Sequence, residues 1–543
     1  MRNFWGSFLG SVIGLILAFV VFAFILVAGI SSIFSDFEGD QDNVFLEVKD
    51  QTVIHLNWNP ALGDRPEENP FSAFDENNPK SGDFFFVLRA LEAAAKDEKI
   101  VGLYMDMDRM PTGMANMDEL LVALENFKAS GKFIMAYGET IAQKTYLAMS
   151  VADEIGLNPY GDFVMTGLGA EMMFFKGVLD KIGVEPYAIR PQGNKFKSAV
   201  EPFLYEQASD ANRQQMRALL GSMWQRMGQR IAQRTQMSMP QLDSLISNLS
   251  VTQAKEALKY GFIDVLAYED EFMDKVAAKA GWEDGFSEDA PLLAFHKYAS
   301  KVQAEWVADR LENPTIAVIY AGGSIVRGKG NSDEIASDDL VETIREVRED
   351  DEVKAAVLRV NSPGGDALAS EIIWRELSLL KAEKPLIVSM GNLAASGGYY
   401  ISCLGDSIFA NPNTITGSIG VFGLLFNAQT MLNDRLGVTT DTVNIHSHAN
   451  FGSGARPLPE REKEVLQESV DKVYTDFRRR VADGRGLTME FVDSIGQGRV
   501  WTGTMALELG LVDARGGLDD AIACAVRVSS LNDYTIKGFP EKE

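Results

Sequence analysis

The spacing of hydrophobic positions changes along the chain, and each spacing predicts a different kind of element. An uncharged apolar run extends over residues 8–30. At about 1.5 Å per helical residue, such a run crosses a hydrocarbon core of about 30 Å. Farther on, strand-like apolar segments such as 99–108 and 352–361 alternate with long amphipathic segments such as 210–234 and 460–482. The pattern predicts a single transmembrane helix followed by an α/β protein with mostly parallel strands.

The charges on either side of the apolar run differ. Arg2 precedes the run, whereas Asp36, Glu38 and Asp40 follow it. The positive-inside rule then leaves residues 1–7 in the cytoplasm and exports the rest of the chain. A cleaved secretory signal would have an apolar region of only about 7–15 residues. We therefore expect an uncleaved single-pass anchor at residues 8–30, in contact with membrane lipid.

The chain after the anchor contains an internal duplication. The segment 99–108 returns as 352–361, and 133–138 returns as 386–391 with the same spacing. A later segment, 257–264, returns as 506–513 with nearly that spacing, and Gly183-Val184 corresponds to Gly437-Val438. A spacing that drifts so little over this length predicts two copies of one fold.

Acidic residues, glycine and proline gather between the two copies, at 283–291. Such a composition is typical of a boundary between folded units. We expect an N-terminal copy at 45–298, a helical linker at 299–312 and a C-terminal copy at 313–543.

Composition excludes several classes of protein. The chain has 543 residues, 46% of them hydrophobic and 24% charged, which is enough material for more than one core. Its formal net charge of −26 argues against a nucleic-acid partner, because phosphate binding needs a basic face. Two cysteines are too few for a zinc cluster, and four histidines offer little for imidazole chemistry.

The two copies differ after the first repeated strand. The C-terminal copy has Asn361-Ser-Pro-Gly-Gly-Asp366 there, and glycines at a strand end can turn backbone N–H groups toward a ligand. Such donors suit the negative oxygen that develops when a carbonyl is attacked. In the N-terminal copy, Pro111 and Thr112 replace Gly364 and Gly365, and proline has no N–H to donate. A simple Pro-Gly turn is the alternative explanation of this segment.

A second difference follows the next repeated strand. The segment Gly391-Asn-Leu-Ala-Ala-Ser-Gly-Gly-Tyr399 places Ser396 among small residues, where the strand gives way to a predicted helix. A serine at such a turn either caps the helix or is an exposed nucleophile. In the N-terminal copy, Gln143 replaces Ser396 and Lys144-Thr145 replaces Gly397-Gly398. Because the glycine turn and the serine are absent together, we interpret both as catalytic features of the C-terminal copy.

A serine hydroxyl needs a base to become a nucleophile. His446 and His448 lie in a polar stretch that is typical of a mobile loop, which makes them weak candidates. A lysine can serve if burial lowers its pKa toward neutrality. Lys197 lies among apolar residues, and the repeat places Phe451 at its position in the C-terminal copy. Spacing alone leaves Lys195 as an equal alternative.

At these residues the chain resembles the signal peptide peptidase A family, also called protease IV, in its long duplicated bacterial form. The resemblance covers nearly the whole chain and rests on four motifs, at 196–203, 361–365, 395–398 and 416–420. It implies that Lys197 is the general base and Ser396 the nucleophile. It also implies tandem folds similar to the Clp protease subunit and the crotonases, and a bowl-like homotetramer at the bacterial inner membrane with a periplasmic catalytic part. The implied substrates are cleaved signal peptides and other apolar peptides.

The expected mechanism needs no metal and no organic cofactor. We expect the backbone N–H groups of Gly365 and Gly397 to stabilise the oxyanion, with Gly364 shaping the turn. Ser418 is a candidate for orienting the lysine ammonium, with a simple turn hydroxyl as the alternative. Two rival functions are a crotonase-like acyl-CoA enzyme, which would use the same oxyanion hole, and a noncatalytic membrane scaffold.

Overall fold

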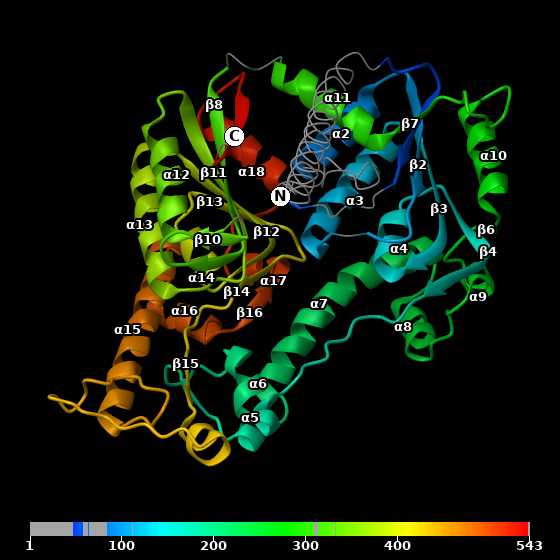
Figure 1. The fold of residues 1–543 in the computed structure, drawn as a ribbon. Coiled ribbons are helices and arrows are strands. Elements are labelled where there is room, and N and C mark those ends of the chain that lie inside the picture. The colour runs from blue at the N-terminus through cyan, green and yellow to red at the C-terminus, as the bar shows by residue number, and fades with distance from the viewer. Residues whose placement is uncertain are drawn as a thin grey trace, which may run out of the picture.

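The computed structural model of the chain describes residues 47–57, 63–64, 84–110, 112–308, 313–331 and 333–540. The predicted anchor at 8–30 lies outside these residues. Among the helices that are described, none has both the length and the apolar character needed to cross a membrane. Two open sheets dominate the described chain, one on each side of the molecule in Figure 1, and helix α11 lies between them at the top.

The first sheet is built from the N-terminal half of the described chain. Its strand order is β6-β4-β3-β2-β1-β7, and neighbouring strands are parallel. The strands are β1 (Thr52–Leu56), β2 (Ile100–Asp106), β3 (Phe133–Ala142), β4 (Glu154–Val164), β6 (Val265–Leu266) and β7 (Leu292–Ala294). The helices are α2 (Phe84–Lys96), α3 (Met114–Ala129), α4 (Gln143–Met149), α7 (Asp210–Thr235), α8 (Met239–Ser247), α9 (Ala254–Lys259), α10 (Glu269–Ala280) and α11 (Phe295–Ala308).

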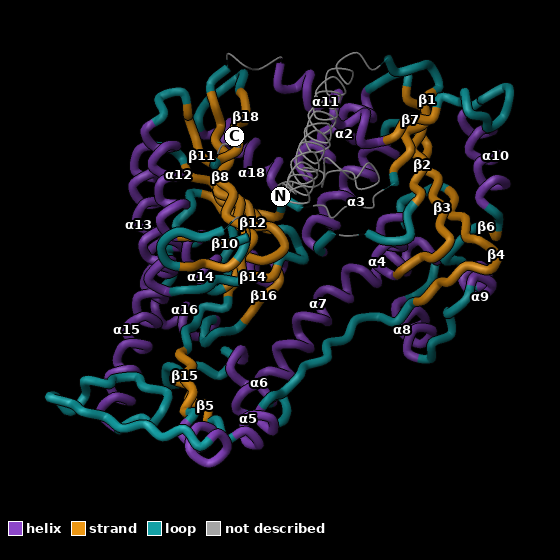
Figure 2. The backbone as a smooth tube through the Cα atoms, in the orientation of Figure 1, coloured by secondary structure: helices purple, strands orange, loops and turns teal. Residues whose placement is uncertain are grey.

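Apolar clusters cover both faces of this sheet, as parallel pairing requires. One cluster includes Phe127, Tyr146 and Phe163, and the other surrounds Phe272. Helix α11 belongs to the first cluster through Tyr298. The strands and helices in Figure 2 alternate along the chain, which confirms the predicted α/β class.

The second sheet repeats the first. Its order is β16-β14-β12-β11-β8-β18, with β13 beside β12 and β17 beside β13. The strands are β8 (Thr315–Gly322), β11 (Val353–Ser362), β12 (Leu386–Ala395), β13 (Ser407–Ala410), β14 (Ile415–Gly417), β16 (Val500–Thr502), β17 (Ala514–Arg515) and β18 (Thr535–Phe539), and a small parallel pair joins β9 (Ser324–Val326) and β10 (Glu334–Ala336). The helices are α12 (Ser337–Glu349), α13 (Ala367–Glu383), α14 (Gly397–Ser402), α15 (Glu460–Arg485), α16 (Met489–Ile495), α17 (Gly503–Glu508) and α18 (Leu518–Val528).

The two copies meet at two junctions. At the lower junction in Figure 1, β5 (Glu185–Ile189) of the N-terminal copy pairs antiparallel with β15 (Gly423–Asn427) of the C-terminal copy. Helices α5 (Lys176–Ile182) and α6 (Glu201–Leu204) lie beside this pair, together with the single turns η3 (Ser198–Val200) and η4 (Met431–Arg435). The lower junction therefore brings residues from both halves of the chain into one small unit.

The upper junction is polar and buried. The Asn392 side chain accepts hydrogen bonds from the backbone N–H groups of Ala115 and Asn116, at 2.9 and 3.3 Å, so the C-terminal copy caps helix α3 of the other copy. The Arg359 side chain is 1% exposed and donates to the Asp64 carboxylate at 2.6 Å. Separating the partners of so buried a pair would leave an unpaired buried charge, which is strongly unfavourable. The pair therefore stabilises one orientation of the two copies.

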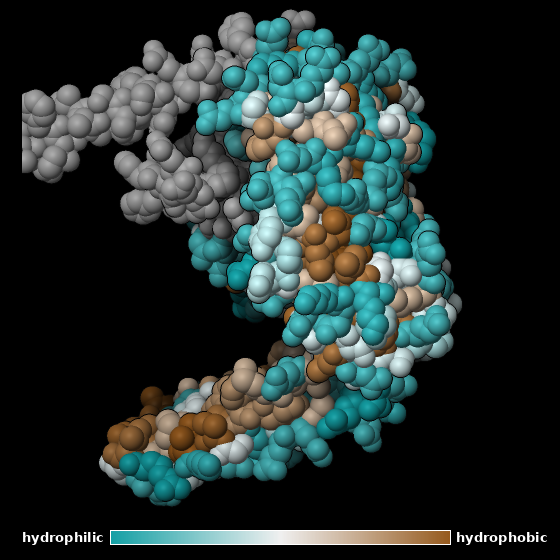
Figure 3. All heavy atoms as spheres, turned by 90° about the vertical axis from the view of Figure 1, so that its right-hand side faces the viewer, coloured by the Kyte–Doolittle hydropathy of each residue, from teal (hydrophilic) through white to brown (hydrophobic). Residues whose placement is uncertain are grey.

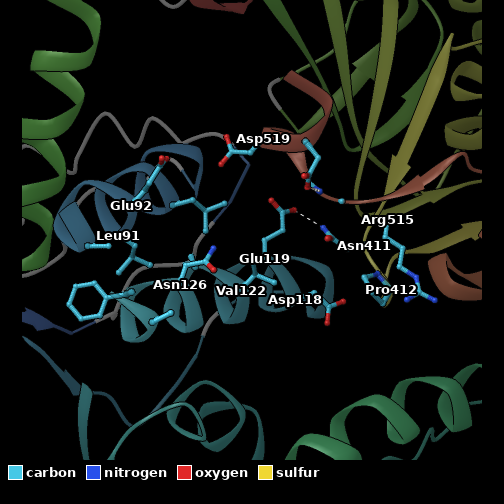
Figure 4. Close-up of a pocket in the computed structure, with 18 of the residues that line it drawn as sticks. Leu91, Glu92, Asp118, Glu119, Val122, Asn126, Asn411, Pro412, Arg515 and Asp519 are labelled. Atoms are coloured by element: carbon cyan, nitrogen blue, oxygen red, sulfur yellow. Dashed lines mark hydrogen bonds between the residues drawn. The ribbon is translucent and has the colours of Figure 1, made fainter. Parts of the chain in front are cut away.

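A cavity of 760 Å³ lies at the upper junction, between helices α2 and α3 and the segment 515–520. In Figure 4 the Glu119 side chain points from α3 toward Asn411, whose amide donates to it at 2.6 Å. Burial raises the pKa of Glu119 to about 7, although nearby Arg359 opposes the shift. Neither Ser396 nor Lys197 lines this cavity.

Candidate active site

Ser396 occupies the turn between strand β12 and helix α14. Its φ angle is 55°, a positive value that costs a serine energy and is held here by the surrounding fold. The backbone N–H of Ser396 donates to the Gly417 carbonyl at 2.9 Å. This arrangement, in which a short turn presents a serine between a strand and a helix, is the geometry of a nucleophile elbow.

Lys197 comes from the other copy and meets Ser396 at the lower junction. Its side chain is 6% exposed. The Nζ atom lies 3.0 Å from Ser396 Oγ, 2.9 Å from Ser418 Oγ and 3.2 Å from the Ser418 carbonyl oxygen. A neutral amine can donate both of its N–H bonds to Ser418 and keep its lone pair for the Ser396 hydroxyl proton.

Burial changes the acidity of this lysine. Desolvation lowers the pKa of Lys197 to about 8, because the ammonium form loses contact with water. The hydrogen-bonding partners of Nζ within the described chain are serine oxygens, not carboxylates. A substantial fraction of the side chain is therefore neutral near pH 8 and able to accept a proton.

The glycine turn after β11 approaches the serine closely. Gly364 has φ +94°, and a Cβ atom there would lie 2.4 Å from the Gly397 nitrogen and 2.8 Å from Ser396 Cβ. Its own N–H donates to Ser362 Oγ at 3.1 Å. Within the described residues the N–H groups of Gly365 and Gly397 have no hydrogen-bond acceptor. Both N–H groups are therefore unpaired within the described chain.

The alternative bases lie elsewhere. Lys195 is exposed, with Lys197 buried two residues later. His446 is exposed, and His448 Nδ1 lies 3.0 Å from Glu462 Oε1. Neither histidine contacts Ser396 in the described part of the chain. Phe451, at the repeat position of Lys197, is 46% exposed.

The corresponding place in the N-terminal copy is occupied by its own hydrogen bonds. Gln143 stands where the repeat places Ser396, and its Oε1 accepts from the Gly167 N–H at 2.8 Å while its Nε2 donates to the Gly167 carbonyl at 3.0 Å. Lys144 donates to the Thr112 carbonyl. The side chains that replace the serine and the following glycine in this copy are thus engaged in hydrogen bonds within the chain.

Three residues of the segments around the lysine were not singled out in the sequence. Gly498 has φ +79°, and a Cβ there would lie 2.5 Å from Lys197 Cβ, so only glycine allows this close approach. The Gln215 amide donates to the Phe196 carbonyl at 3.1 Å. The Glu201 carboxylate is 1% exposed and accepts from Ser209 and Asn212. Of the three, only Glu201 could have been recognised in the sequence, because it lies within the 196–203 motif.

This geometry is suited to acyl transfer. It offers a strained serine, a buried lysine of lowered pKa within hydrogen-bonding distance and two free backbone donors nearby. A nucleophile, a base and an oxyanion site are the three parts that such chemistry needs.

Comparison with known proteins agrees with this chemistry. The family model described as "Peptidase family S49" matches residues 126–283 and again residues 378–531, once in each copy. "Protease 4" of Salmonella typhi is 34% identical over 492 residues, which cover 89% of this chain and 76% of that protein. "Protease 4" of Haemophilus influenzae is 32% identical, covering 92% and 81%. "Serine protease SPPA, chloroplastic" of Arabidopsis thaliana is 34% identical, covering 81% and 64%.

A solved structure is also similar over part of the chain. A ClpP1 mutant from Listeria monocytogenes has 14% sequence identity and a TM-score of 0.25, with 38% of this chain and 94% of that chain covered. A score this low carries no argument about the fold. The family model matches both copies, and the relatives align over most of the chain. The chain therefore belongs to peptidase family S49 and is a serine peptidase with a duplicated family domain.

Proposed function

We propose that this serine peptidase works through a Ser396–Lys197 dyad and degrades signal peptides after their release from exported proteins. The observation that carries the dyad is the 3.0 Å contact between Lys197 Nζ and Ser396 Oγ in a buried site, where no carboxylate of the described residues bonds the amine. The crotonase-like and scaffold alternatives do not suit a chain that belongs to a family of serine peptidases.

In the proposed mechanism, neutral Lys197 accepts the hydroxyl proton of Ser396 as Oγ attacks the substrate carbonyl. The N–H groups of Gly365 and Gly397 stabilise the oxyanion. Lys197 then gives its proton to the leaving amine, which leaves an acyl-enzyme. Lys197 next accepts a proton from water, and the resulting attack releases the second product. Ser418 acts as a positioning residue, because its two oxygens hold the amine next to Ser396.

The elements around the dyad favour an apolar substrate. Leu368 and Ile372, on helix α13 directly after the glycine turn, are 51% and 39% exposed, and their spacing places them on one helix face. Phe422, which follows the Ser418 loop, is 37% exposed. The middle of a signal peptide is itself a run of apolar residues, so it would bury these side chains.

We also propose the setting in which this activity operates. Residues 8–30 anchor the chain in the bacterial inner membrane, with the catalytic part in the periplasm. Two Clp/crotonase-like copies, at 45–298 and 313–543 with a linker at 299–312, form the catalytic part, and chains assemble as a homotetramer. The apolar run with its flanking charges and the relatives in Salmonella typhi and Haemophilus influenzae support this setting.

The substrate class can be tested with synthetic peptides. The detergent-solubilised full chain should cleave a fluorogenic signal peptide with a kcat/KM at least about tenfold above that for a scrambled peptide whose apolar run is interrupted by serines. The Ser396→Ala variant should cleave neither peptide. Equal rates on both peptides would contradict the substrate proposal, and a serine-reactive probe that fails to label the wild type would contradict the nucleophile.

The rate should depend on the ionisation of Lys197. Only the neutral amine accepts a proton, and the pKa is about 8, so kcat/KM should rise with pH, reach half its maximum near about pH 8 and level off about one pH unit higher. The measurement is a pH–rate profile between pH 5.5 and 9.5. The double variant His446→Ala with His448→Ala should show the same profile. A rate that instead follows the ionisation of a group of pKa about 6.5, and activity that is lost in the histidine variant, would identify an imidazole base.

A further inference from the structure

Strand β16 lies at an edge of the second sheet, next to the residues of the proposed dyad. Among the described strands it pairs with β14, where Val500 lies opposite Gly417. The Gly417 carbonyl accepts the Ser396 N–H at 2.9 Å. The Ser418 N–H donates to the Arg499 carbonyl at 2.7 Å. An edge strand also has backbone N–H groups that point away from the sheet, and these need partners from another element.

Helix α7 of the N-terminal copy supplies such a partner. Figure 1 shows this helix running from the N-terminal sheet down toward the lower junction, past β16. The Val500 N–H donates to the Gln215 side-chain oxygen at 3.4 Å. Farther along α7, Ser222 Oγ lies 3.0 Å from Thr502 Oγ1. Two polar side chains of α7 therefore reach across to the edge strand of the other copy.

The same glutamine holds the segment that carries the lysine. Gln215 Nε2 donates to the Phe196 carbonyl at 3.1 Å and to Ser198 Oγ at 2.9 Å, and these residues flank Lys197. The Gln215 side chain is 6% exposed. An amide offers two N–H donors and one carbonyl acceptor, and this one uses both ends. One buried side chain thus connects the backbone around the base with the edge strand of the copy that contains the nucleophile.

Two further contacts place the lysine turn against the C-terminal copy. The Phe196 N–H donates to the Gln497 carbonyl at 3.0 Å. A Cβ on Gly498 would lie 2.5 Å from Lys197 Cβ, so the two backbones are very close there. These contacts come from the C-terminal copy, whereas Gln215 comes from the N-terminal copy. The turn is therefore enclosed between α7 and residues 497–500, and Gln215 contacts both sides.

The counterpart of Gln215 in the other copy is apolar. Helices α7 and α15 each have 26 residues and begin at residues 210 and 460, so Gln215 corresponds to Val465. Val465 cannot form the hydrogen bonds that the amide forms, and it is 36% exposed. It belongs to the copy that has Phe451 at the position of Lys197. The amide and the lysine are thus present together in one copy and absent together from the other.

The lysine segment belongs to the lower junction, since it lies between β5 and α6. Figure 3 shows apolar residues gathered along an arm at the bottom of the molecule, below a concave surface. The lower junction occupies the bottom of the molecule in Figure 1 as well. A small shift of these segments relative to the second sheet would change the distance between Nζ and Oγ, and misplacement by about 1 Å can cost about 10²-fold in rate.

From these contacts we propose that Gln215 is a positioning residue for peptide cleavage: it fastens the Lys197 turn to β16 and thereby keeps Nζ within reach of the Ser396 hydroxyl. The inference rests on the proposed dyad and adds the side chain that aligns it. Gln215 touches neither the substrate nor the reacting atoms, and it acts through the backbone on both sides of the lysine.

Gln215→Met tests this role, because methionine has a similar length and forms none of the amide's hydrogen bonds. With the detergent-solubilised full chain and a fluorogenic signal peptide, kcat should fall by about 10²-fold. KM should change by less than about threefold, because the variant leaves the substrate-binding surface as it is.

The pH–rate profile gives a readout that a merely structural role would not move. The pKa of Lys197 is lowered to about 8 by desolvation, so a loosened turn that admits water should raise it. The half-maximum of kcat/KM should move up by at least about 0.5 pH unit, toward the ordinary lysine value of about 10.4. The variant changes no charge nearby: Arg499 stays over the Phe196 ring, and Glu201 stays bonded to Ser209. A smaller fraction of folded protein would lower the rate equally at every pH.

Two residues of the same helix provide matched controls. Gln214 is the exposed neighbour of Gln215, and Gln214→Met should change kcat by less than about threefold. Ser222→Ala removes the other contact between α7 and β16 and leaves the lysine segment untouched. It should leave the half-maximum of the pH–rate profile where it is in the wild type. An equal shift in Ser222→Ala would assign the effect to the junction as a whole and overturn the role of Gln215.

Ser198→Ala keeps the inference testable if Gln215→Met fails to fold. It removes one of the two acceptors of the amide and leaves helix α7 intact. A loss of about 3–10-fold in kcat is expected, with a shift of the profile in the same direction, since the Phe196 contact remains. Unchanged profiles in both Gln215→Met and Ser198→Ala would overturn the inference.

The Lys197→Met variant separates failure of this inference from failure of the dyad. Wild-type activity in Lys197→Met would overturn the dyad and the inference together. Loss of activity in Lys197→Met, with wild-type kcat and an unshifted profile in Gln215→Met, would leave the dyad standing and overturn the positioning role alone.

Discussion

Replacing Lys197 with methionine should lower kcat/KM for an apolar peptide by at least about 10⁴-fold, as expected when a base is removed from a unit that acts with its nucleophile. Methionine fills a similar volume but cannot accept a proton. The Nζ atom is the only described basic group within hydrogen-bonding distance of Ser396 Oγ, so no neighbour can replace it. The measurement is steady-state hydrolysis by wild type and variant at pH 8.

The matched control is Lys195→Met. It removes a lysine two positions away that is exposed, and it should change the rate by less than about threefold, as expected for a surface side chain. The double variant Ser396→Ala with Lys197→Met should be no slower than either single variant, because the two groups act in one step. Additive losses would contradict the dyad.

Thermal unfolding distinguishes a lost base from a lost fold. The folded protein lowers the pKa of Lys197 to about 8, so below that pH folding must bury a positive charge. Stability therefore increases as pH rises from about 8 toward the pKa of an unfolded lysine. Lys197→Met removes this cost, and the variant should have a Tm at pH 7 equal to or above that of the wild type.

Gly364→Ala should reduce kcat by about 10²–10³-fold, the loss expected when an oxyanion donor is displaced. An added Cβ would lie 2.4 Å from the Gly397 nitrogen, so the turn must move away from the serine. The φ of +94° adds strain for any residue with a side chain. The change should appear in kcat more than in KM, because the donors act on the transition state.

Gly328→Ala is the control for this change. Gly328 also has a positive φ, +74°, but a Cβ there meets no described atom within 4 Å. Both variants carry the cost of a left-handed alanine, and only Gly364→Ala moves the turn against Gly397. Comparable activity losses in the two variants would assign the effect to backbone strain alone and contradict the oxyanion role.

The duplication explains how one chain supplies both members of the proposed dyad. The serine lies at the elbow after β12 in one copy, and the lysine follows β5 in the other. The β5–β15 pair and the Arg359–Asp64 contact fix the copies relative to one another at opposite ends of their contact. Residues far from the reaction therefore control its geometry, because a shift of one copy would separate Nζ from Oγ.

Much of the fold was predictable from local pattern. The repeated apolar segments predicted β2 with β3 and β11 with β12, and the amphipathic periodicity predicted α7 and α15 close to their observed bounds. Burial on both faces of a parallel sheet leaves continuous apolar strands, which are visible without knowing their partners. The serine elbow was visible for a similar reason, since small residues between a strand and a helix form a local signal.

The sequence by itself determined the α/β class and the elbow at Ser396, because each depends on residues close together in the chain. It also determined the duplication, because matching segments recur at a nearly constant spacing. Spacing left Lys195 and Lys197 equal and the family resemblance pointed to Lys197, but only the tertiary structure gives the physical difference, since burial of one and exposure of the other depend on packing against a distant segment. It also decided the roles of Gly498 and Gln215, whose contacts lie across the junction of the two copies. Periodicity records which face of an element is buried, but it does not record which distant element covers that face.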